Sequence, residues 1–288
     1  MHNMQAMLAS SQLPQLAAGE VALVGAGCGS LGNLTLAAFK LISTAEAVVF
    51  DALVDSDILG LLPESCERYD MGKRGGVVCG GKVSSSQDAI NHKLLSLAQR
   101  GLKVLRLKGG DPNVFGRGTE EALFLAEHGI KSQFVAGVTA ALGCAAAAAI
   151  PLTHRGVSRS VTLVTGHQAS GDTTHHWRAL LDLGSTLVFY MGKDQAQKIA
   201  ASLLLAGGSS ELPMVFISAG CRDSQQLHYA TVGTMAAVAK TISSEGPTLM
   251  IIGEVVAVGR ELQQLLNDID VGEQKVSVSG GLRHAIAG

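Results

Sequence analysis

The chain has 288 residues, of which 47% are hydrophobic and 16% are charged, a balance typical of a globular protein with a sizeable core. Its 22 basic and 24 acidic residues give a net charge of −2, which argues against nucleic-acid binding because such surfaces need a clustered basic excess. No stretch is apolar for long enough to span a membrane, so composition favours one or two globular domains.

The first half of the chain alternates between strand and helix patterns. Strands are predicted at 21–24, 47–51, 104–107 and 131–135, and helices at 34–42, 89–99 and 120–128. This alternation is typical of an α/β layer architecture with mainly parallel strands. Sheets of this kind bind ligands beyond the carboxyl ends of their strands.

A domain boundary is predicted near Gly137, where a turn precedes an alanine-rich helix that Pro151 would end. A second α/β block follows, with strands predicted at 160–164, 186–190, 214–217, 226–231 and 249–252, and a helix at 194–206. Two such blocks imply two α/β domains with a ligand cleft between them. The predicted ranges are a flexible extension at 1–18, an N-terminal domain at 19–136, a C-terminal domain at 137–266 and a flexible tail at 267–288.

Cysteine spacing predicts no metal site, because the five cysteines are scattered and no two form a CxxC pair. Reduced thiols are expected instead. The first fifteen residues lack the positive start and apolar run of a signal peptide, so a cytoplasmic location is the expectation.

A glycine-rich loop, GCGSLG at 27–32, directly follows the first predicted strand. It matches the G-x-G-x-x-G pattern of dinucleotide-binding folds, and Asp51 ends the next strand, where such folds hold a ribose-binding acid. An NAD-dependent oxidoreductase is therefore one possible function.

The most informative stretch is RLKGGDPNVFGRGTEE at 106–121. Gly109 and Gly110 let the backbone approach a ligand closely, because neither has a Cβ atom. Arg117 and Glu120, three residues apart, would share one face of a helix. Taken alone, this stretch would also fit a strand-to-helix turn with a surface ion pair.

Five further motifs occur in order: GKRGG at 72–76, PLTHR at 151–155, VTGH at 164–167, VFYMG at 188–192 and IIGEVV at 251–256. Together with RLKGGDP they resemble the uroporphyrinogen-III C-methyltransferases, which are tetrapyrrole methylases that use S-adenosyl-L-methionine (SAM). The resemblance covers about residues 21–260 and implies two α/β domains, SAM between them, and a homodimer. It also implies two methyl transfers, from uroporphyrinogen III through precorrin-1 to precorrin-2, with S-adenosyl-L-homocysteine as co-product.

The resemblance assigns candidate roles. Asp51 would accept a proton and Lys73 would donate one, although a loop cap and a substrate-carboxylate anchor are the plainer alternatives. Arg117 and Arg155 would bind substrate carboxylates, and Glu120 would face the pyrrole N–H groups or hold Arg117. The positions that match SAM contacts are Cys28, Gly109, Gly110, Asp111, Val114, Thr139, Ala140, Met191 and Gly220. The implied chemistry requires no metal, because an electron-rich pyrrole carbon attacks the methyl group itself.

The glycine-rich loop departs from the family pattern GAGPGD, because Cys28 stands in place of proline and Ser30 in place of aspartate. Proline would pre-organise the loop, and the aspartate would add a charge near the active site. SAM affinity or substrate positioning could therefore differ from the family norm. The other readings that stay open are a SAM-dependent methylase of another tetrapyrrole and a tetrapyrrole carrier without turnover. The product would feed siroheme or cobalamin biosynthesis.

Overall fold

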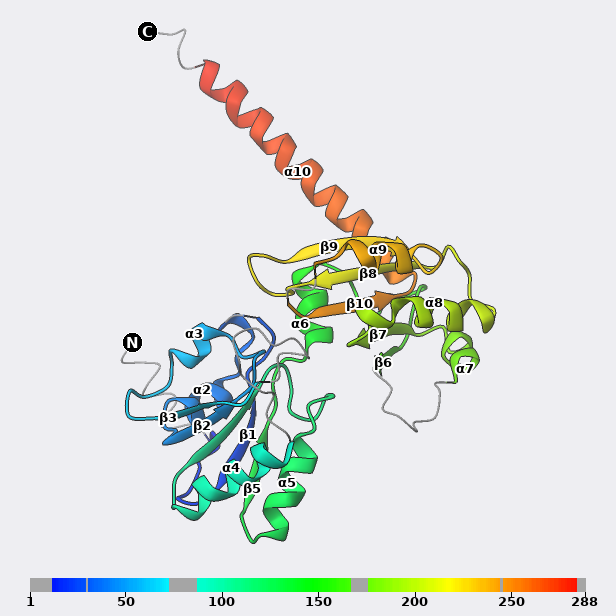
Figure 1. Cartoon of the computed structure of the whole chain (residues 1–288). Helices are drawn as coiled ribbons and strands as arrows, with labels where there is room; N and C mark the ends of the chain where they lie inside the picture. The colour runs from blue at the N-terminus through cyan, green and yellow to red at the C-terminus, as the bar shows by residue number, and fades with distance from the viewer. Residues whose placement is uncertain (1–11, 30, 73–86, 167–175, 244–245, 284–288) are drawn as a thin grey trace. The chain divides into compact units, whose positions relative to one another are not determined.

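The computed structural model describes residues 12–29, 31–72, 87–166, 176–243 and 246–283, with side chains described as far as Ile269 (Figure 1). The chain forms two compact units: Met1–Cys144 with Ala219–Gln225, and Ala145–Ser218 with Gln226–Gly288. Each unit contains one five-stranded sheet, which confirms the α/β class. The division falls inside α6 (Ala140–Ala147), a few residues beyond the boundary predicted near Gly137.

The sheet of the first unit has the strand order β3-β2-β4-β1-β5, and every pairing in it is parallel. Its strands are β1 Val21–Gly25, β2 Ala47–Phe50, β3 Glu67–Asp70, β4 Val104–Lys108 and β5 Ser132–Val135. The predicted parallel arrangement is confirmed here, and it brings the carboxyl ends of β1, β2 and β4 to one edge.

Helices cover both faces of this sheet. Figure 1 shows α2 (Leu36–Ile42) and α3 (Ser56–Leu59) on one side, with α4 (Gln87–Gln99) and α5 (Gly118–Glu127) on the other. Alternate strand residues enter two different core clusters: Ala22 packs in the cluster with α2, and Val21 in the cluster with α4. Burial on both faces explains why these strands read as continuous apolar runs.

The sheet of the second unit has the order β6-β7-β10-β8-β9. Its strands are β6 Val161–Thr165, β7 Thr186–Tyr190, β8 Pro213–Ser218, β9 Gln226–Thr231 and β10 Thr248–Ile252. Only β6 and β7 pair in parallel, and the other three pairings are antiparallel. The mainly parallel arrangement predicted for the first half of the chain therefore does not extend to this unit. The β8–β9 connection shows the reason: it is too short for the crossover that parallel neighbours need.

The core of the second unit lies between its sheet and three helices, α7 (Trp177–Asp182), α8 (Ala196–Leu205) and α9 (Met235–Thr241). Phe189 and Phe216 from the sheet are fully buried in this cluster. The described residues also form two short 3-10 helices, η1 (Leu31–Asn33) and η2 (Lys193–Gln195).

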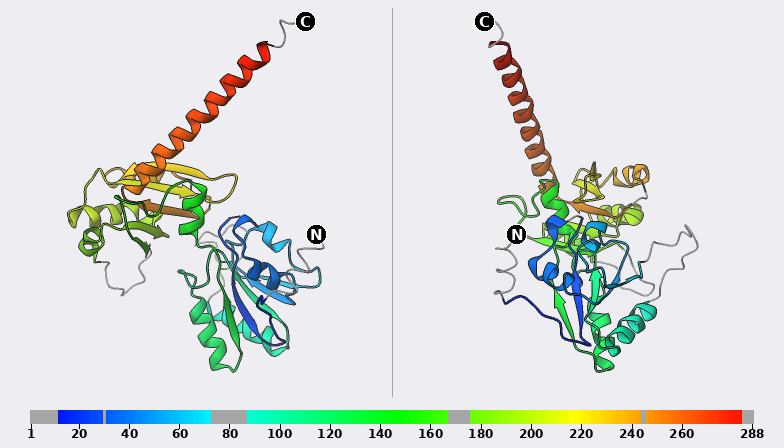
Figure 2. Two further views of the ribbon diagram at one scale, coloured as in Figure 1. Left: turned by 180° about the vertical axis from the view of Figure 1, so that it is seen from behind. Right: turned by 90° about the vertical axis from the view of Figure 1, so that its left-hand side faces the viewer.

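The chain ends differ from the predicted flexible extensions. Near the start, Leu16 is buried in the first core, and Gln133 Nε2 donates a hydrogen bond to the Gln15 carbonyl at 2.7 Å. At the other end, α10 (Val255–Arg283) is one continuous helix through most of the predicted tail (Figure 2). Serine and glycine at 279–281 suggested a tail because they are weak helix formers, but no proline follows Pro247 to interrupt the backbone hydrogen bonds.

Residues 1–11 of the predicted N-terminal extension lie outside the described residues. Within the described ranges, none of the helices combines the length and apolarity needed to traverse a lipid bilayer.

Candidate functional site

The carboxyl ends of β1 and β4 are tied together by backbone hydrogen bonds. The Ala26 N–H donates to the Lys108 carbonyl at 2.8 Å, and the Gly110 N–H donates to the Gly27 carbonyl at 2.7 Å. Gly110 has a φ of 71°, a conformation that favours glycine. The glycine-rich loop and the GGDP corner therefore form a single structural feature.

Three backbone segments meet at this corner without any side chain between them. A Cβ atom added to Gly25 would lie 2.5 Å from the Gly137 nitrogen, and one added to Gly137 would lie 2.8 Å from the Gly25 Cα. The Gly137 Cβ would also overlap the carbonyl oxygen of Gly110. Glycine is required at these positions because any larger residue would push backbone away from backbone.

Asp111 locks the corner to the segment that leads into α6. Its Oδ1 accepts from the Asn113 N–H at 2.8 Å, and its Oδ2 accepts from the Gly137 N–H at 3.0 Å. Three other predicted SAM positions lie together, because Gly110 lies against Thr139 and Ala140. Val114 belongs to the turn after Asp111, and its N–H donates to the Asp111 carbonyl. Both Asp111 oxygens thus hold backbone, a positioning contact that the sequence did not predict.

Gly109 joins the corner to the loop after β2. A Cβ atom there would lie 2.5 Å from the Cβ of Leu53. Asp51 begins this loop, and its Oδ1 accepts from the Leu53 N–H at 3.0 Å, which is the loop-cap contact expected as the alternative to catalysis. Lys73, the other predicted catalytic residue, lies outside the described residues, as does Ser30.

Arg117 and Glu120 form a two-point ion pair at the start of α5. Arg117 Nε lies 3.0 Å from Glu120 Oε1, and Arg117 Nη2 lies 2.6 Å from Glu120 Oε2. Both side chains are about half exposed, so the pair is accessible to a ligand. Hydrogen bonding to Arg117 lowers the pKa of Glu120. The structure therefore shows Glu120 holding Arg117, one of the two arrangements expected.

The backbone just before α5 is strained. Arg117 has a φ of 57° and Phe115 a φ of 54°, both in the left-handed region that residues with a Cβ rarely adopt. Such outliers persist only where surrounding contacts enforce them, and they are frequent at functional sites.

Glu121, next to Glu120, is fully buried and was missed by the sequence reasoning. Its Oε1 accepts from Arg106 Nε at 3.1 Å, Lys108 Nζ at 3.0 Å and Gln87 Nε2 at 3.1 Å. Its Oε2 is buried and has no hydrogen-bond partner among the described residues. The signal was present in the sequence, because two cations on one strand buried on both faces need a buried acid.

Lys108 links this buried charge group to Asp51. The register pairs Phe50 with Leu107, so Asp51 and Lys108 follow side by side at the ends of β2 and β4. Burial lowers the pKa of Lys108, and the Arg106 charge lowers it further, while the Glu121 and Asp51 carboxylates act in the opposite direction. The Lys108 charge thus complements the Asp51 carboxylate.

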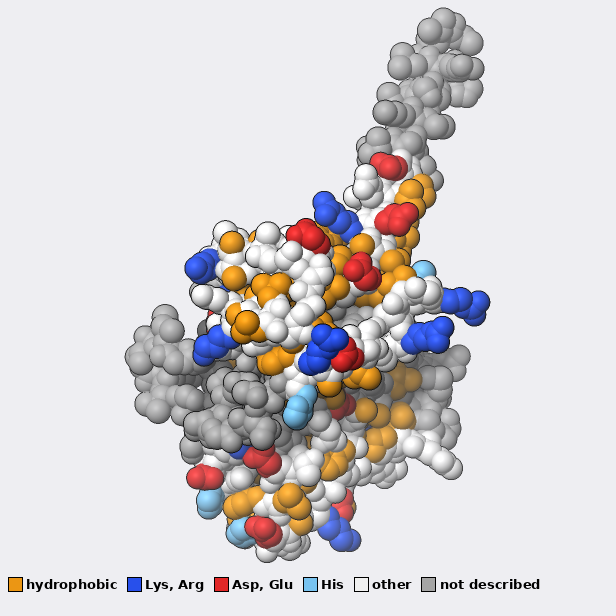
Figure 3. All heavy atoms as spheres, turned by 90° about the vertical axis from the view of Figure 1, so that its right-hand side faces the viewer, with side chains coloured by type: hydrophobic (Ala, Val, Ile, Leu, Met, Phe, Trp, Pro, Cys, Tyr) orange, Lys and Arg blue, Asp and Glu red, His pale blue; other side chains and the backbone are white. Residues whose placement is uncertain are grey.

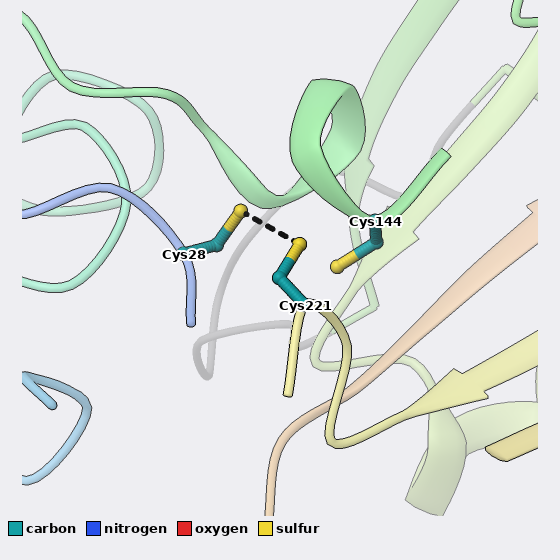
Figure 4. A group of neighbouring side chains, drawn as sticks. All are labelled: Cys28, Cys144 and Cys221. Carbon is teal, nitrogen blue, oxygen red and sulfur yellow. Dashed lines mark hydrogen bonds between the residues drawn. The ribbon is translucent and has the colours of Figure 1, made fainter. Parts of the chain in front are cut away.

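Three thiols gather beside the glycine corner, where cysteine spacing had predicted no cluster (Figure 4). The sulfur atoms of Cys28, Cys144 and Cys221 all lie within 4.8 Å of one another, and Cys28 Sγ is 3.5 Å from Cys221 Sγ. The connection between β8 and β9 carries Cys221 and its neighbour Gly220, a predicted SAM position, into the first unit. The three residues lie 28, 144 and 221 residues into the chain, so no local spacing rule could detect them.

The three thiols differ in acidity. Hydrogen bonding from Cys144, and secondarily from Cys221, lowers the pKa of Cys28 to about 7 against the opposing effect of burial. Burial raises the pKa of Cys221 to about 11, and the hydrogen bond to Cys28 together with burial raises that of Cys144. Cys28 is therefore the most acidic thiol of the three.

Two predicted site residues belong to the second unit. Arg155 is exposed in a turn closed by the backbone pairing of His154 with Ser158. Met191 follows β7 with a φ of 53° and is 55% exposed. This unit has a cavity of about 370 Å³, lined by Thr186 and Gly253 at the other end of β7. Neither Arg155 nor Met191 lines it.

The geometry of the glycine-rich loop does not support a dinucleotide site. In such sites the third glycine permits close packing of a helix on the strand, whereas a Cβ added to Gly32 would meet no atom of the described residues within 4 Å. The loop also runs into the 3-10 helix η1 rather than directly into an α-helix.

Comparison with known proteins gives one consistent family. The model of the tetrapyrrole (corrin/porphyrin) methylases matches residues 20–236. The siroheme synthase of Saccharophagus degradans is 44% identical over 238 residues, which are 83% of this chain and 51% of that protein. The siroheme synthase of Pseudomonas aeruginosa PAO1 is 44% identical over 244 residues, 85% of this chain and 51% of that protein. The chain thus spans about half the length of these curated relatives.

Solved structures agree. The uroporphyrin-III C-methyltransferase of Thermus thermophilus, complexed with S-adenosyl homocysteine, is 36% identical with a TM-score of 0.69, covering 83% of this chain and 99% of that one. A cobalt precorrin-4 methyltransferase with a TM-score of 0.73 is 20% identical, covers 85% of this chain and 99% of that one, and is similar in fold.

Proposed function

The chain belongs to the tetrapyrrole (corrin/porphyrin) methylase family, and we propose on that premise that it is a SAM-dependent uroporphyrinogen-III C-methyltransferase. The reaction would add two methyl groups, through precorrin-1 to precorrin-2, for siroheme or cobalamin biosynthesis. The observation that carries the proposal is the side-chain-free corner at Gly25, Gly110 and Gly137, in a chain similar to a methyltransferase complexed with S-adenosyl homocysteine.

This corner suits a ligand that is bound through backbone groups. Gly110 lies against Thr139 and Ala140, where α6 begins, and the first N–H groups of a helix lack partners within the helix. Asp111 fixes the approach of the two segments through Gly137. The contacts proposed for Cys28, Val114, Met191 and Gly220 rest on the family resemblance.

SAM, when bound, supplies an electrophilic methyl group. The chain then needs to orient the macrocycle, hold its carboxylates and accept the proton lost from the methylated position. Arg117 presents a half-exposed guanidinium at the start of α5, and Asp51 is the first residue after β2. Asp51 Oδ1 caps the loop, so the second oxygen of that carboxylate is the proposed proton acceptor. Lys73 as proton donor and Arg155 as a second carboxylate ligand complete the proposal.

An anaerobic assay with uroporphyrinogen III and methyl-labelled SAM tests this function. Label at two carbons of the macrocycle is the expected result. SAM binding without transfer to uroporphyrinogen III would contradict the proposed substrate and favour another tetrapyrrole or a carrier. Binding of NAD without SAM binding would favour the oxidoreductase instead.

Arg117→Ala is expected to raise the KM for uroporphyrinogen III by about tenfold to a hundredfold, because it removes a charge-assisted contact worth about 1.5–3 kcal/mol. The Kd for SAM, measured by calorimetry, should change less than about twofold. Arg178→Ala is the matched control, because Arg178 is also an exposed arginine paired with a nearby acid. A main effect of Arg117→Ala on SAM affinity would reassign Arg117 to the cofactor.

We also propose that the chain forms a homodimer, and the exposed face of α10 supports this. Leu262, Leu265, Leu266 and Ile269 are 43–57% exposed and recur at the i, i+3, i+4, i+7 spacing of a helix–helix seam. Figure 3 shows hydrophobic side chains along the described part of this helix. An identical helix is a complementary partner for such a stripe. A cytoplasmic location remains part of the proposal.

Leu265→Glu combined with Leu266→Glu is expected to shift the molecular mass measured by light scattering from dimer to monomer, because two carboxylates would be buried at the seam. Gln264→Glu adds a charge beside the stripe and should leave the dimer intact. A dimer that survives the double substitution would locate the interface elsewhere.

A further inference from the structure

We propose that Cys28, Cys144 and Cys221 form a three-thiolate site for a thiophilic metal cation, Zn²⁺ or Cu⁺. The three side chains come from the loop after β1, from α6 and from the β8–β9 connection, and Figure 4 shows their sulfur atoms turned toward one another. All three belong to the first unit, so the site is complete within one compact body.

The sulfur spacing suits one shared metal. Zinc–sulfur bonds are about 2.3 Å long, which places two sulfurs on a tetrahedral ion about 3.8 Å apart. The three thiols lie within 4.8 Å of one another, with Cys28 Sγ and Cys221 Sγ at 3.5 Å. Shifts of less than about 1 Å would therefore bring all three into the first coordination sphere.

The surrounding backbone holds these thiols in place. Asn33 Nδ2 donates to the Cys28 carbonyl at 2.8 Å, and the Cys221 N–H donates to Gln225 Oε1 at 2.9 Å. Cys221 is held at a φ of 62°, which a residue with a Cβ adopts only under constraint. A Cβ on Gly143 would overlap the Cys28 sulfur, so glycine at that position leaves room for the thiol.

The chemistry of three thiols favours a metal over a disulfide. Soft thiolates select cations such as Cu⁺ and Zn²⁺, and each thiol releases its proton to solvent when it binds. A Cys28–Cys221 disulfide would use only two of the three sulfurs and would need an external oxidant to remove two electrons and two protons. Cys144 is 5% exposed, whereas Cys28 and Cys221 are half-buried and give the cation a route of entry.

A filled site would alter the neighbouring glycine corner. The Cys28 S–H points to the Thr139 carbonyl at 3.9 Å, and both residues are proposed SAM contacts. Metal binding should therefore weaken SAM binding, a consequence that rests on the proposed function. The metal site itself does not.

The test is an anaerobic titration of the reduced full chain. Cd²⁺ is followed by its thiolate charge-transfer absorption, and Zn²⁺ and Cu⁺ by competition with chromophoric chelators. One cation per chain is expected. Cys28→Ser, Cys144→Ser and Cys221→Ser should each weaken binding by more than about a hundredfold, because loss of a direct ligand exceeds the effect of losing a supporting residue. Cys66→Ser is the matched control, because Cys66 is buried in the separate α2 core cluster.

A second measurement needs no variant. Zn²⁺ should protect Cys28 and Cys221 of the wild-type chain from iodoacetamide, while Cys66 is labelled at the same rate with or without the metal. Failure to bind any of the three cations, or unchanged affinity in Cys144→Ser, would overturn the proposal. A mass loss of two hydrogen atoms in air, without metal binding under reducing conditions, would replace the metal site with a disulfide. Failure of SAM to bind would count against the proposed function alone, because the metal readouts require no SAM.

Discussion

Glu121→Gln is expected to lower the free energy of unfolding of the first unit by about 3–5 kcal/mol, the cost of leaving buried charge uncompensated. Glu121 is fully buried, and its Oε1 is the acceptor for both Arg106 and Lys108, which are 3% and 5% exposed. Glutamine keeps the side-chain volume and one acceptor oxygen, so no cavity forms. The loss therefore reports charge rather than packing.

The difference in the free energy of unfolding between Glu121→Gln and wild type should shrink as pH rises. Burial already lowers the pKa of Lys108, and removing the Glu121 carboxylate, which acts to raise it, lowers it further. A lysine whose folded pKa lies below its unfolded value of about 10.4 binds fewer protons when folded, so stability rises with pH between the two values. The variant should thus recover stability relative to wild type as pH rises from the lowered folded pKa of Lys108 toward its unfolded value of about 10.4.

Hydrogen exchange of peptides from β4 and α5 measures the loss of stability of the first unit in Glu121→Gln. The single tryptophan, Trp177, belongs to the second unit, so its fluorescence serves as an internal reference. Glu120→Gln is the matched control, because its side chain is 56% exposed and surface ion pairs contribute at most about 1 kcal/mol. Equal losses of stability in the two variants would show that the Glu121 carboxylate does not compensate the buried charges of Arg106 and Lys108.

Local pattern was enough to predict most elements of the first unit. Its strands are buried on both faces, so their apolar runs stand out from the sequence. β3 was missed because ERYD alternates between half-buried and exposed side chains at the edge of the sheet. The antiparallel pairings of the second sheet were missed because the helix–strand alternation that predicts parallel strands breaks down there: no helix lies between β8 and β9.

Some features of the candidate site could likewise be predicted from local sequence, and others depend on tertiary contacts. The glycines and the Arg117–Glu120 pair follow from local motifs, since each lies within one short stretch. The three-thiol cluster depends on tertiary contacts between Cys28, Cys144 and Cys221, which sequence spacing does not encode. Glu121 differs from Glu120 only in the face of α5 that it occupies, and only folding decides which face is buried.

Gly137→Ala is expected to weaken SAM binding by at least about a hundredfold while leaving the second unit folded. Overpacking costs about 1–3 kcal/mol where side chains can give way, and here the obstacles are backbone atoms. The new Cβ would overlap the Gly110 carbonyl and lie 2.8 Å from the Gly25 Cα, so the segments must separate and stretch the Asp111–Gly137 hydrogen bond. Calorimetric titration with SAM measures the effect, and Trp177 fluorescence checks the fold of the second unit.

Gly32→Ala is the matched control, and it also distinguishes a SAM site from a dinucleotide site. Gly32 lies in the same glycine-rich loop, yet its Cβ would meet no atom within 4 Å in the part of the chain that the structure describes, so SAM affinity should stay within about twofold. A dinucleotide site would demand the reverse, because its third glycine permits close packing of a helix on the strand. Tolerance at Gly32 together with loss at Gly137 would therefore assign the corner to SAM. SAM binding that survives Gly137→Ala would place the cofactor away from the corner, whatever the activity of the chain.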